Sequence, residues 1–290
     1  MKMRPWLLAS AVLLFTACQT VPLTGRSQLL LLGEGEEVRM GLRSYEDFLK
    51  KEKISDDPAL NAQLQRVGKR IAAATGKNYQ WEFKVVENDK AINAFCLPGG
   101  KVAVYTGILP LTRDDAGLAA VVGHEVAHAI ARHGGERMSQ QMLVAGLTAA
   151  VVVSASDSRK ANMYAGLLGA GAAVGYLLPY SRLQESEADR MGLIYMAKAG
   201  YDPHAALALW QRMAEESKRE GKPPEFLSTH PADSTRIRQI QQWLPEAMGY
   251  YVPRSEAAPE AASGAEREKA GEPAKDAARE GAEKPAKRRK

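Results

Sequence analysis

The chain contains a five-residue segment, His124-Glu125-Val126-Ala127-His128, whose residue types and spacing could hold a metal and activate water. On a helix, positions four apart lie about 40° apart on one face, so both imidazoles can reach a single Zn²⁺. Glu125 lies about 100° round from His124, where it can touch water at the metal without ligating the metal. Zinc lowers the pKa of that water towards roughly 7, and a carboxylate can then take its proton as it attacks a carbonyl. The segment therefore predicts metal-assisted hydrolysis.

Two histidines on a polar surface are the alternative, because a pattern this short also occurs by chance. The neighbouring residues argue against it, since they are apolar on both sides of the motif, as at Leu118 and Val122. Histidines that an apolar helix buries need partners for their ring nitrogens, and a metal supplies one. We predict a metal helix over residues 113–133, with Thr112 as its N-cap and Gly134-Gly135 ending it.

A catalytic zinc normally has three protein ligands and an open position, so a third ligand must come from elsewhere in the chain. A second predicted helix, residues 182–198, carries Glu185, Glu187 and Asp189. Glu185 and Asp189 are four residues apart and share a face, whereas Glu187 points elsewhere and is expected at the solvated surface. Asp189 could accept the free N–H of a ligating histidine. An ordinary exposed acidic stripe is the alternative, and geometry alone does not choose between Glu185 and Glu187.

The histidine motif and the acidic helix are two of five segments that carry a resemblance to a known family. They are HEVAH at 124–128, SRLQESEADRMG at 181–192, NAFCLPGG at 93–100, AGYDP at 199–203, and STHP at 228–231 followed by Arg236-Ile237. Together, from about residue 34 to 244, they resemble the zinc metallopeptidases that include HtpX, the CAAX-prenyl proteases and the mitochondrial Oma-type proteases. The resemblance implies that Glu185 is the third zinc ligand, Glu125 the general base, and Asp189 an outer carboxylate that can also donate a proton.

The resemblance also bears on the remaining polar residues of the site. In some family members the matching histidine occupies the open position on the zinc, which implies that His230 holds this enzyme latent, with Pro231 stiffening its approach. Arg236 is expected to orient substrate or stabilise the oxyanion, or else to pair with a carboxylate. His133 and His204 are expected to be structural or surface residues.

Hydrophobic periodicity predicts a mainly helical α+β domain with a small sheet, as does the resemblance to zincin-like peptidases. Further helices are expected at 34–51, 58–74, 203–219 and 233–244, and a strand at 79–87. A β-hairpin is expected from 93–97 and 101–105 around Pro98-Gly99-Gly100. Its free edge beside the metal helix would offer backbone groups to an extended peptide, with Asn93, Ala94 and Phe95 as the contacts. Ordinary core and turn roles for these three residues are the alternative.

Two apolar segments, residues 142–153 and 163–178, separate the metal helix from the acidic helix. Each is shorter than the roughly 20 residues that span a bilayer. We predict two helices or a mobile hairpin near the active-site cleft, acting as a lid or as a contact with a membrane surface.

The N-terminus has the features of an export signal. Basic residues precede an apolar stretch over residues 6–15, and Phe15-Thr16-Ala17-Cys18 resembles the lipobox of bacterial lipoproteins. Residues 1–17 are then a signal peptide, Cys18 is the lipidated mature N-terminus, and residues 18–33 are a lipid-anchored linker. Ordinary secretion is the alternative. Gln19, rather than aspartate, favours the outer membrane of a Gram-negative bacterium, facing the periplasm.

The rest of the composition sets limits on the function. With Cys18 lipidated only Cys96 remains, so no intrachain disulfide can form, and Cys96 is expected to be a small buried hydrophobe rather than a nucleophile. Residues 34–252 suffice for one metallopeptidase domain, whereas residues 253–290 lack large apolar side chains and are predicted to be a disordered charged tail. The net charge of +5 is too small and too scattered to imply nucleic-acid binding.

These features predict an endopeptidase of the bacterial envelope that holds one Zn²⁺ per chain and forms no acyl-enzyme. Family resemblance makes misfolded or stalled periplasmic and outer-membrane proteins the expected substrates. An envelope assembly chaperone with little or no proteolysis is the alternative, which the intact Glu125 disfavours because binding needs no base. A zinc enzyme acting on non-peptide amides is a second alternative, which the predicted peptide-accepting hairpin disfavours.

Overall fold

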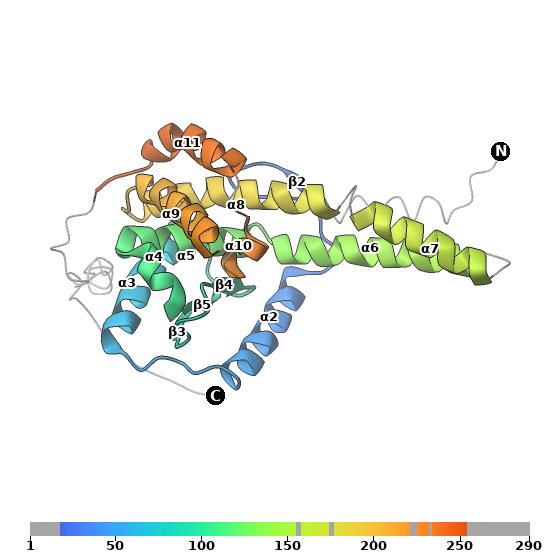
Figure 1. Cartoon of the computed structure of the whole chain (residues 1–290), viewed down its shortest axis with the longest axis horizontal. Helices are drawn as coiled ribbons and strands as arrows, with labels where there is room; N and C mark the ends of the chain where they lie inside the picture. The colour runs from blue at the N-terminus through green and yellow to red at the C-terminus, as the bar shows by residue number, and fades with distance from the viewer. Residues whose placement is uncertain (1–17, 155–157, 174–176, 221–224, 232–233, 254–290) are drawn as a thin grey trace, which may run out of the picture. The chain divides into compact units, whose positions relative to one another are not determined.

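The metal helix and its neighbours form a mainly helical α+β domain in the computed structural model of the chain, as predicted (Figure 1). The structure describes residues 18–154, 158–173, 177–220, 225–231 and 234–253. The predicted signal peptide, and the predicted tail beyond its first residue, lie outside the described residues.

Helix α5 (Asp115–Ile130) carries the histidine motif and is buried from Gly117 to Ile130. A helix that is apolar on all sides belongs in a core, which explains why both histidines of the motif are buried. Its N-cap is Asp114, whose carboxylate accepts the Gly117 N–H at 2.8 Å. The prediction of Thr112 as the N-cap is wrong, because Thr112 ends a separate short helix, α4 (Leu109–Thr112).

The predicted end of the metal helix at Gly134-Gly135 is also wrong. Helix α5 stops at Ile130, the chain turns at Arg132 with φ 59°, and helix α6 (His133–Ser154) begins directly afterwards. An ion pair of 2.7 Å with Glu37 holds the Arg132 side chain at this turn. The Glu37 carboxylate also leaves no room for a side chain at Gly135, so the glycine serves helix packing rather than helix termination.

Helix α8 (Leu178–Lys198) packs along α5 and brings the acidic residues to the histidines. Gly123 of α5 faces Gly192 of α8, and a Cβ added at Gly192 would lie 3.0 Å from the backbone nitrogen of His124. Because neither position carries a side chain, the two backbones approach closely enough for the carboxylates of α8 to reach the imidazoles of α5.

The substitution Gly192→Ala is expected to lower stability, because the new methyl group has no space between the two helices. Overpacking costs about 1–3 kcal/mol, and each kcal/mol lowers Tm by about 2–4 °C in a domain of this size. Thermal unfolding of the zinc-free protein measures the change. Gly146→Ala is the matched control, since nothing lies within 4 Å of a Cβ added there, and its Tm should equal or exceed that of wild type. A wild-type Tm for Gly192→Ala would contradict this account of the packing.

A three-stranded sheet packs against α5 with its edge strand beside the histidine motif. It consists of β3 (Glu82–Val86), β4 (Ala94–Leu97) and β5 (Lys101–Tyr105) in the order β3-β5-β4. Strands β4 and β5 form the predicted antiparallel hairpin, and Gly99 and Gly100 in its turn have φ 90° and 83°. Strand β3 runs parallel to β5, an arrangement that the sequence pattern did not predict.

The other predicted helices are present, with ends shifted by a few residues. They are α2 (Glu34–Leu49), α3 (Pro58–Thr75), α9 (His204–Glu220) and α11 (Ser234–Met248). Three short helical turns were not predicted: the 3₁₀ turn Thr106–Ile108, helix α4 and helix α10 (Glu225–Thr229). Helix α3 starts with Pro58 at its first position and Asp57 as its N-cap, as the sequence indicated.

An ion pair between Arg66 of α3 and Asp115 of α5 joins these two helices at 2.7 Å. Burial opposes ionisation of Asp115, but hydrogen bonds from Arg66 and Gln63 hold its pKa below the ordinary value. A lowered folded-state pKa adds stability above the unfolded pKa of about 4, and this stability is lost as the pH falls through the folded value.

Asp115→Asn is therefore expected to lower the free energy of unfolding at pH 7 by at most about 1 kcal/mol, since the pair is partly exposed. The difference from wild type should shrink below pH 4 and vanish when the carboxylate is protonated in both states. Urea unfolding from pH 7 to pH 3 measures it. A difference that stays constant over this range would show that ionisation of Asp115 is not its source.

The segment before α2 forms a hairpin of β1 (Cys18–Thr20) and β2 (Ser27–Leu29). Gln28 Nε2 donates to the Ala131 carbonyl at 2.9 Å, and the Leu31 N–H donates to Ser139 Oγ at 2.8 Å. This N-terminal hairpin therefore lies against the junction between α5 and α6.

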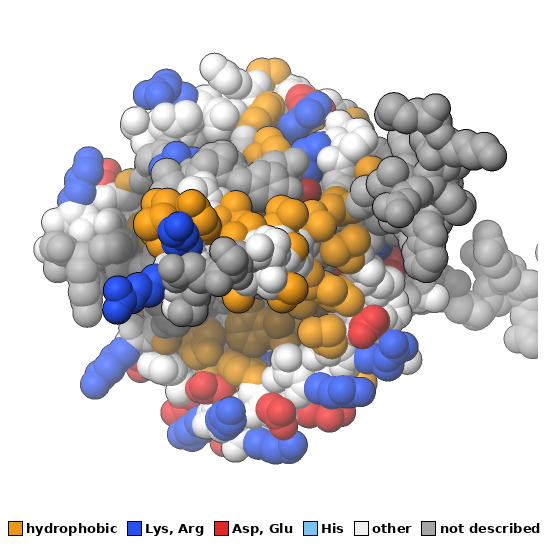
Figure 2. Space-filling model, turned by 90° about the vertical axis from the view of Figure 1, so that its right-hand side faces the viewer, with side chains coloured by type: hydrophobic (Ala, Val, Ile, Leu, Met, Phe, Trp, Pro, Cys, Tyr) orange, Lys and Arg blue, Asp and Glu red, His pale blue; other side chains and the backbone are white. Residues whose placement is uncertain are grey.

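The first predicted apolar segment, residues 142–153, falls in α6, and the second, residues 163–178, falls in α7 (Ser158–Ala172) up to residue 172, with residues 174–176 outside the described residues. Helices α6 and α7 pack against each other and extend away from α5 (Figure 1). Figure 2, seen from this side, shows apolar side chains gathered on the surface, and the exposed ones include Met142, Leu147, Val153, Met163 and Leu167. No helix in the described ranges has both the length and the apolar content that crossing a bilayer requires.

Candidate metal centre

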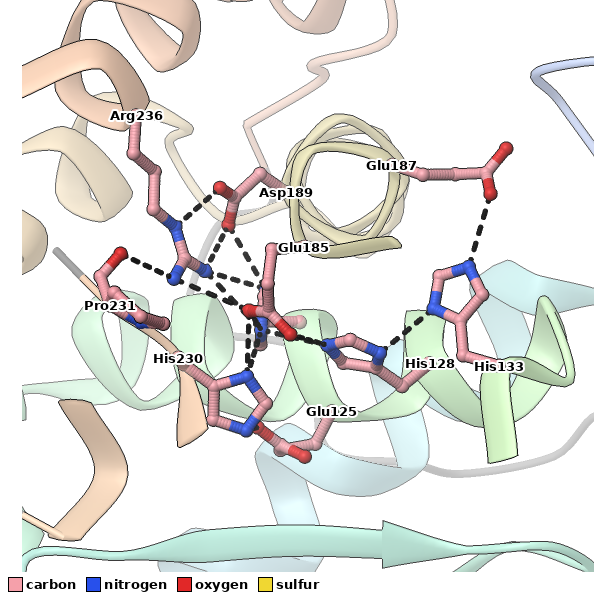
Figure 3. Close-up of polar contacts among 10 residues, drawn as sticks. Glu125, His128, His133, Glu185, Glu187, Asp189, His230, Pro231 and Arg236 are labelled. Carbon is pink, nitrogen blue, oxygen red and sulfur yellow. Dashed lines mark hydrogen bonds and ion pairs between the residues drawn. The ribbon is translucent and has the colours of Figure 1, made fainter. Parts of the chain in front are cut away.

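Four side chains from three elements meet at one point, with one potential ligand atom of each within 4.8 Å of the others. They are His124 and His128 of α5, Glu185 of α8, and His230 directly after α10. Figure 3 shows how His128, Glu185 and His230 point toward one another. The Nε2 atoms of His124 and His128 lie 3.1 Å apart, and the Glu185 carboxylate lies 3.4 and 3.3 Å from them. Two imidazoles and a carboxylate form the donor set of many catalytic zinc sites.

The charges at this point also fit a bound cation. Burial disfavours a charged His124, but Asp189 and Glu185 raise its pKa to about 9, so in the metal-free site a proton supplies positive charge. Burial likewise disfavours a charged Glu185, but His128 and the hydrogen bonds around it hold the Glu185 pKa well below the ordinary value. His128 stays neutral because burial lowers its pKa. Ionised carboxylate and neutral imidazole are the forms that bind zinc, and the ion would replace the proton on His124.

Glu125 lies beside the four ligand candidates without belonging to them. It is 4% exposed, its Oε1 has no hydrogen-bond partner among the described residues, and this atom lies 3.5 Å from His230 Nε2. Burial raises the pKa of Glu125 towards the range in which a carboxylate is an effective base. A buried carboxylate oxygen without a partner is costly, and a water between it and the metal would relieve that cost.

Asp189 and Arg236 form a second layer behind His124. Asp189 Oδ1 lies 3.0 Å from His124 Nδ1, which leaves Nε2 of the ring for the metal. Arg236 donates to both Asp189 oxygens at 2.6 and 2.7 Å and lies 3.5 Å from the centre of the Trp210 ring. Its Nη1 lies 3.3 Å from Glu185 Oε2. In the structure Arg236 therefore pairs with carboxylates, which is one of the roles expected for it.

Glu187 and His133 lie behind His128, where the sequence analysis expected nothing of function. The prediction of Glu187 as a solvated residue is wrong: it is 6% exposed and accepts hydrogen bonds from His133 Nε2 at 3.1 Å and Arg26 Nε at 2.8 Å. His133 is fully buried, with Nδ1 2.8 Å from Nδ1 of His128. Glu187 does point away from the metal, but the N-terminal hairpin covers that side of α8. A contact between residues 26 and 187 leaves no local trace in a sequence.

The predicted peptide contacts lie at the start of the edge strand. The Asn93 carbonyl accepts the Tyr105 N–H at 3.1 Å, and Asn93 Oδ1 accepts the Ala94 N–H at 2.9 Å. The Phe95 ring packs edge-on against Phe48, with centroids 4.9 Å apart. Strand β4 has β5 as its one neighbour among the described strands, so its other edge faces no strand.

Two remaining candidates lie outside the metal centre. His204 is exposed and pairs with Asp202 at 2.7 Å. Cys96 lies in β4, and burial raises its pKa, which keeps the thiol protonated and unreactive.

Comparisons with known proteins agree with this site. A family model described as Peptidase family M48 matches residues 58–244, which include all four ligand candidates and Glu125. The chain is 38% identical over 237 residues to the mitochondrial metalloendopeptidase OMA1 of Schizosaccharomyces pombe, covering 80% of this chain and 68% of that protein. It is 31% identical over 230 residues to the beta-barrel assembly-enhancing protease of Yersinia pestis, covering 77% and 47%. The chain therefore belongs to peptidase family M48 and is a zinc-dependent metalloendopeptidase.

Proposed function

We propose that this metalloendopeptidase degrades unfolded or stalled proteins in the envelope of a Gram-negative bacterium. The similarity to the protease of Yersinia pestis that is named for beta-barrel assembly supports the substrate class. The lipobox-like Phe15-Thr16-Ala17-Cys18 supports the compartment, since the mitochondrial relatives leave the compartment open. The observation that carries the proposal is the edge strand beside the metal helix, because an edge recognises backbone and accepts any extended chain.

Each residue of the metal centre has a separate role in the proposed reaction. Bound zinc, held by His124, His128 and Glu185, would polarise the scissile carbonyl and acidify water. Glu125 takes the proton of the attacking water on its unpartnered Oε1 and passes it to the leaving amine. Asp189 holds His124 in the tautomer that binds metal, and Arg236 holds Asp189.

The edge strand would position the substrate for this reaction. A peptide that extends the sheet along β4 would lie near α5, which packs against β4, and its carbonyls could then reach the histidine motif. Asn93, Ala94 and Phe95 are the proposed contacts. The hydrogen bond from the Ala94 N–H to Asn93 Oδ1 would open so that this N–H can bind the substrate backbone.

The proposal is tested by giving the zinc-loaded mature chain one outer-membrane β-barrel protein in two states, unfolded from urea and folded in detergent micelles. Cleavage of the unfolded state alone is expected, because only an unfolded chain can add a strand to β4. Glu125→Gln provides the control for a contaminating protease. Equal cleavage of both states would overturn the substrate class. Binding of the unfolded chain without cleavage by wild type would favour the assembly chaperone instead.

We further propose that His230 is a fourth zinc ligand in the resting enzyme and keeps it latent. Its Nδ1 lies 2.7 Å from Glu185 Oε2 and 3.2 Å from His124 Nε2, among the other ligand candidates. The segment that carries it is tied down next to the edge strand, because the Phe226 N–H donates to the Ile92 carbonyl at 2.9 Å. One segment thus reaches both the open metal position and the beginning of the peptide-binding edge.

His230→Ala is expected to raise kcat/KM on an unfolded substrate. If the open form makes up at most about a tenth of the resting molecules, the gain should be about tenfold or more. Zinc should remain bound through the other three ligands. Steady-state cleavage and metal analysis of the purified variant measure both quantities. Unchanged activity together with unchanged zinc coordination would show that His230 does not enforce latency.

Cys18 is proposed to be lipidated and to anchor the protein to the outer membrane, facing the periplasm. Its exposure at the start of β1 is compatible with an attached lipid. Incorporation of labelled palmitate by wild type but not by Cys18→Ser is expected, and labelling of both would place the lipid elsewhere.

A further inference from the structure

Hydrogen bonds behind His128 lead away from the metal centre to the N-terminal hairpin. His128 Nδ1 contacts His133 Nδ1 at 2.8 Å, and His133 Nε2 contacts Glu187 Oε2 at 3.1 Å. Arg26 then donates through Nε to Glu187 at 2.8 Å, and Thr24 donates its hydroxyl to the same carboxylate. Figure 3 shows the line from His128 through His133 to Glu187, which runs opposite to the side on which Asp189 and Arg236 lie.

Glu187 determines the direction in which the protons of this line point. An ionised carboxylate only accepts, so His133 must carry its proton on Nε2. A neutral His133 then has a bare Nδ1, which can only accept, so the proton of His128 must lie on its own Nδ1. That tautomer leaves His128 Nε2 bare, and Nε2 is the atom that faces His124 and Glu185. If His128 instead carried its proton on Nε2, that proton would occupy the position where the metal binds.

The network is largely buried, and Arg26 is its partly exposed end. Arg26 also forms two hydrogen bonds of 2.7 and 2.8 Å with Glu136, which in turn accepts one from Gln184 at 2.7 Å. Glu136 and Gln184 are 1% and 0% exposed. The Glu187 carboxylate accepts hydrogen bonds from three donors, His133, Thr24 and Arg26, as an ionised carboxylate can.

We propose that His133, Glu187 and Arg26 form a positioning relay that fixes the tautomer and orientation of His128 as a metal ligand. The N-terminal hairpin is thereby a working part of the metal centre, because it supplies the arginine that ends the relay. None of the three touches the reacting atoms. This inference rests on the proposed function, in which His128 binds zinc.

The first test is the zinc affinity of the full mature chain, measured by competition with a chromogenic chelator. Loss of an outer partner of a zinc ligand weakens metal binding by about 10- to 100-fold. We expect losses in this range for His133→Phe, which removes the acceptor while keeping a ring, and for Glu187→Gln. Arg26→Met should give a smaller loss in the same direction. His133→Gln should restore part of the affinity, since its side-chain oxygen can accept the His128 proton.

Glu246→Gln is the matched control for Glu187→Gln. Glu246 pairs with Arg190 of α8 at 2.8 Å on the surface, away from the network, so its amide variant should bind zinc as wild type does. Unfolding of each zinc-free variant shows whether it folds. If His133→Phe fails to fold, Glu187→Gln and Arg26→Met carry the comparison.

The double variant His133→Phe/Glu187→Gln distinguishes a relay from a general loss of packing around the metal centre. In a relay Glu187 acts only through His133, so the double variant should bind zinc no more weakly than His133→Phe alone. ¹⁵N-histidine NMR of the zinc-free protein should show His128 protonated on Nδ1 in wild type, with the other tautomer appearing in His133→Phe.

The outcomes are distinct. Zinc affinities within twofold of wild type in folded His133→Phe and Glu187→Gln, or losses that multiply in the double variant, would overturn the relay. A wild-type chain that binds no zinc would instead overturn the assignment of His128 as a ligand.

Discussion

Replacement of Glu125 by glutamine is expected to lower kcat by about 10²- to 10⁴-fold, the usual contribution of a general base. Glutamine has the same size but cannot take a proton from water. Zinc should stay bound, because Glu125 is not among the side chains whose ligand atoms converge at the metal centre. KM should change little, since in the proposed binding mode the edge strand, and not this carboxylate, holds the substrate backbone.

The measurement is cleavage of an unfolded protein substrate, with zinc content determined on the same preparations. Glu125→Gln should be measured in wild type and in the His230→Ala background, so that latency does not mask the chemical step. Glu246→Gln makes the same charge change at the surface and should cleave normally. Activity within a few-fold of wild type in both backgrounds would remove Glu125 from the role of base.

Replacement of Glu185 by glutamine is expected to abolish activity by releasing the metal. Its carboxylate supplies the one negative charge among the four ligand candidates and contacts all three histidines. Because outer partners of zinc ligands are worth about 10- to 100-fold in affinity, loss of a direct ligand should exceed about 100-fold. Zinc should be lost on dialysis that leaves wild type and Glu246→Gln loaded.

Chelator titration of the three proteins gives the affinities, and excess zinc should restore part of the activity of Glu185→Gln. Retention of zinc by Glu185→Gln at wild-type affinity would mean that another group completes the ligand set. Glu187→Gln, two residues further along α8, should fall between this variant and the control.

Local sequence signals were sufficient for most elements of the fold. The spacing of apolar residues located the helices, and Asp57-Pro58 marked the start of α3 because a cap and a fixed φ act within one turn. The turn at Gly99 and Gly100 likewise located the hairpin of β4 and β5. The two ends of α5 were predicted wrongly for different reasons: a local cap decides its start, whereas contacts with Glu37 act at its end. Asp114 caps where Thr112 was expected, and Gly135 makes room for Glu37 instead of ending the helix.

The candidate site divides in the same way. The spacing of residues on one helix was enough to predict His124, Glu125 and His128. The choice of Glu185 needed the family resemblance, because neither segment's sequence reveals how close α5 and α8 lie. The structure shows that contact between Gly123 and Gly192 sets this distance. The prediction that Glu187 is exposed was wrong because Arg26, far away in sequence, forms a hydrogen bond with it and helps to bury it.

The metal content and X-ray absorption spectrum of the purified mature chain test the central claim most directly. We expect one zinc per chain, coordinated by nitrogen and oxygen with at least two imidazoles and no sulfur, and a metal that a chelator removes together with the activity. A chain that retains full activity without zinc, or a zinc bound through sulfur, would contradict the account.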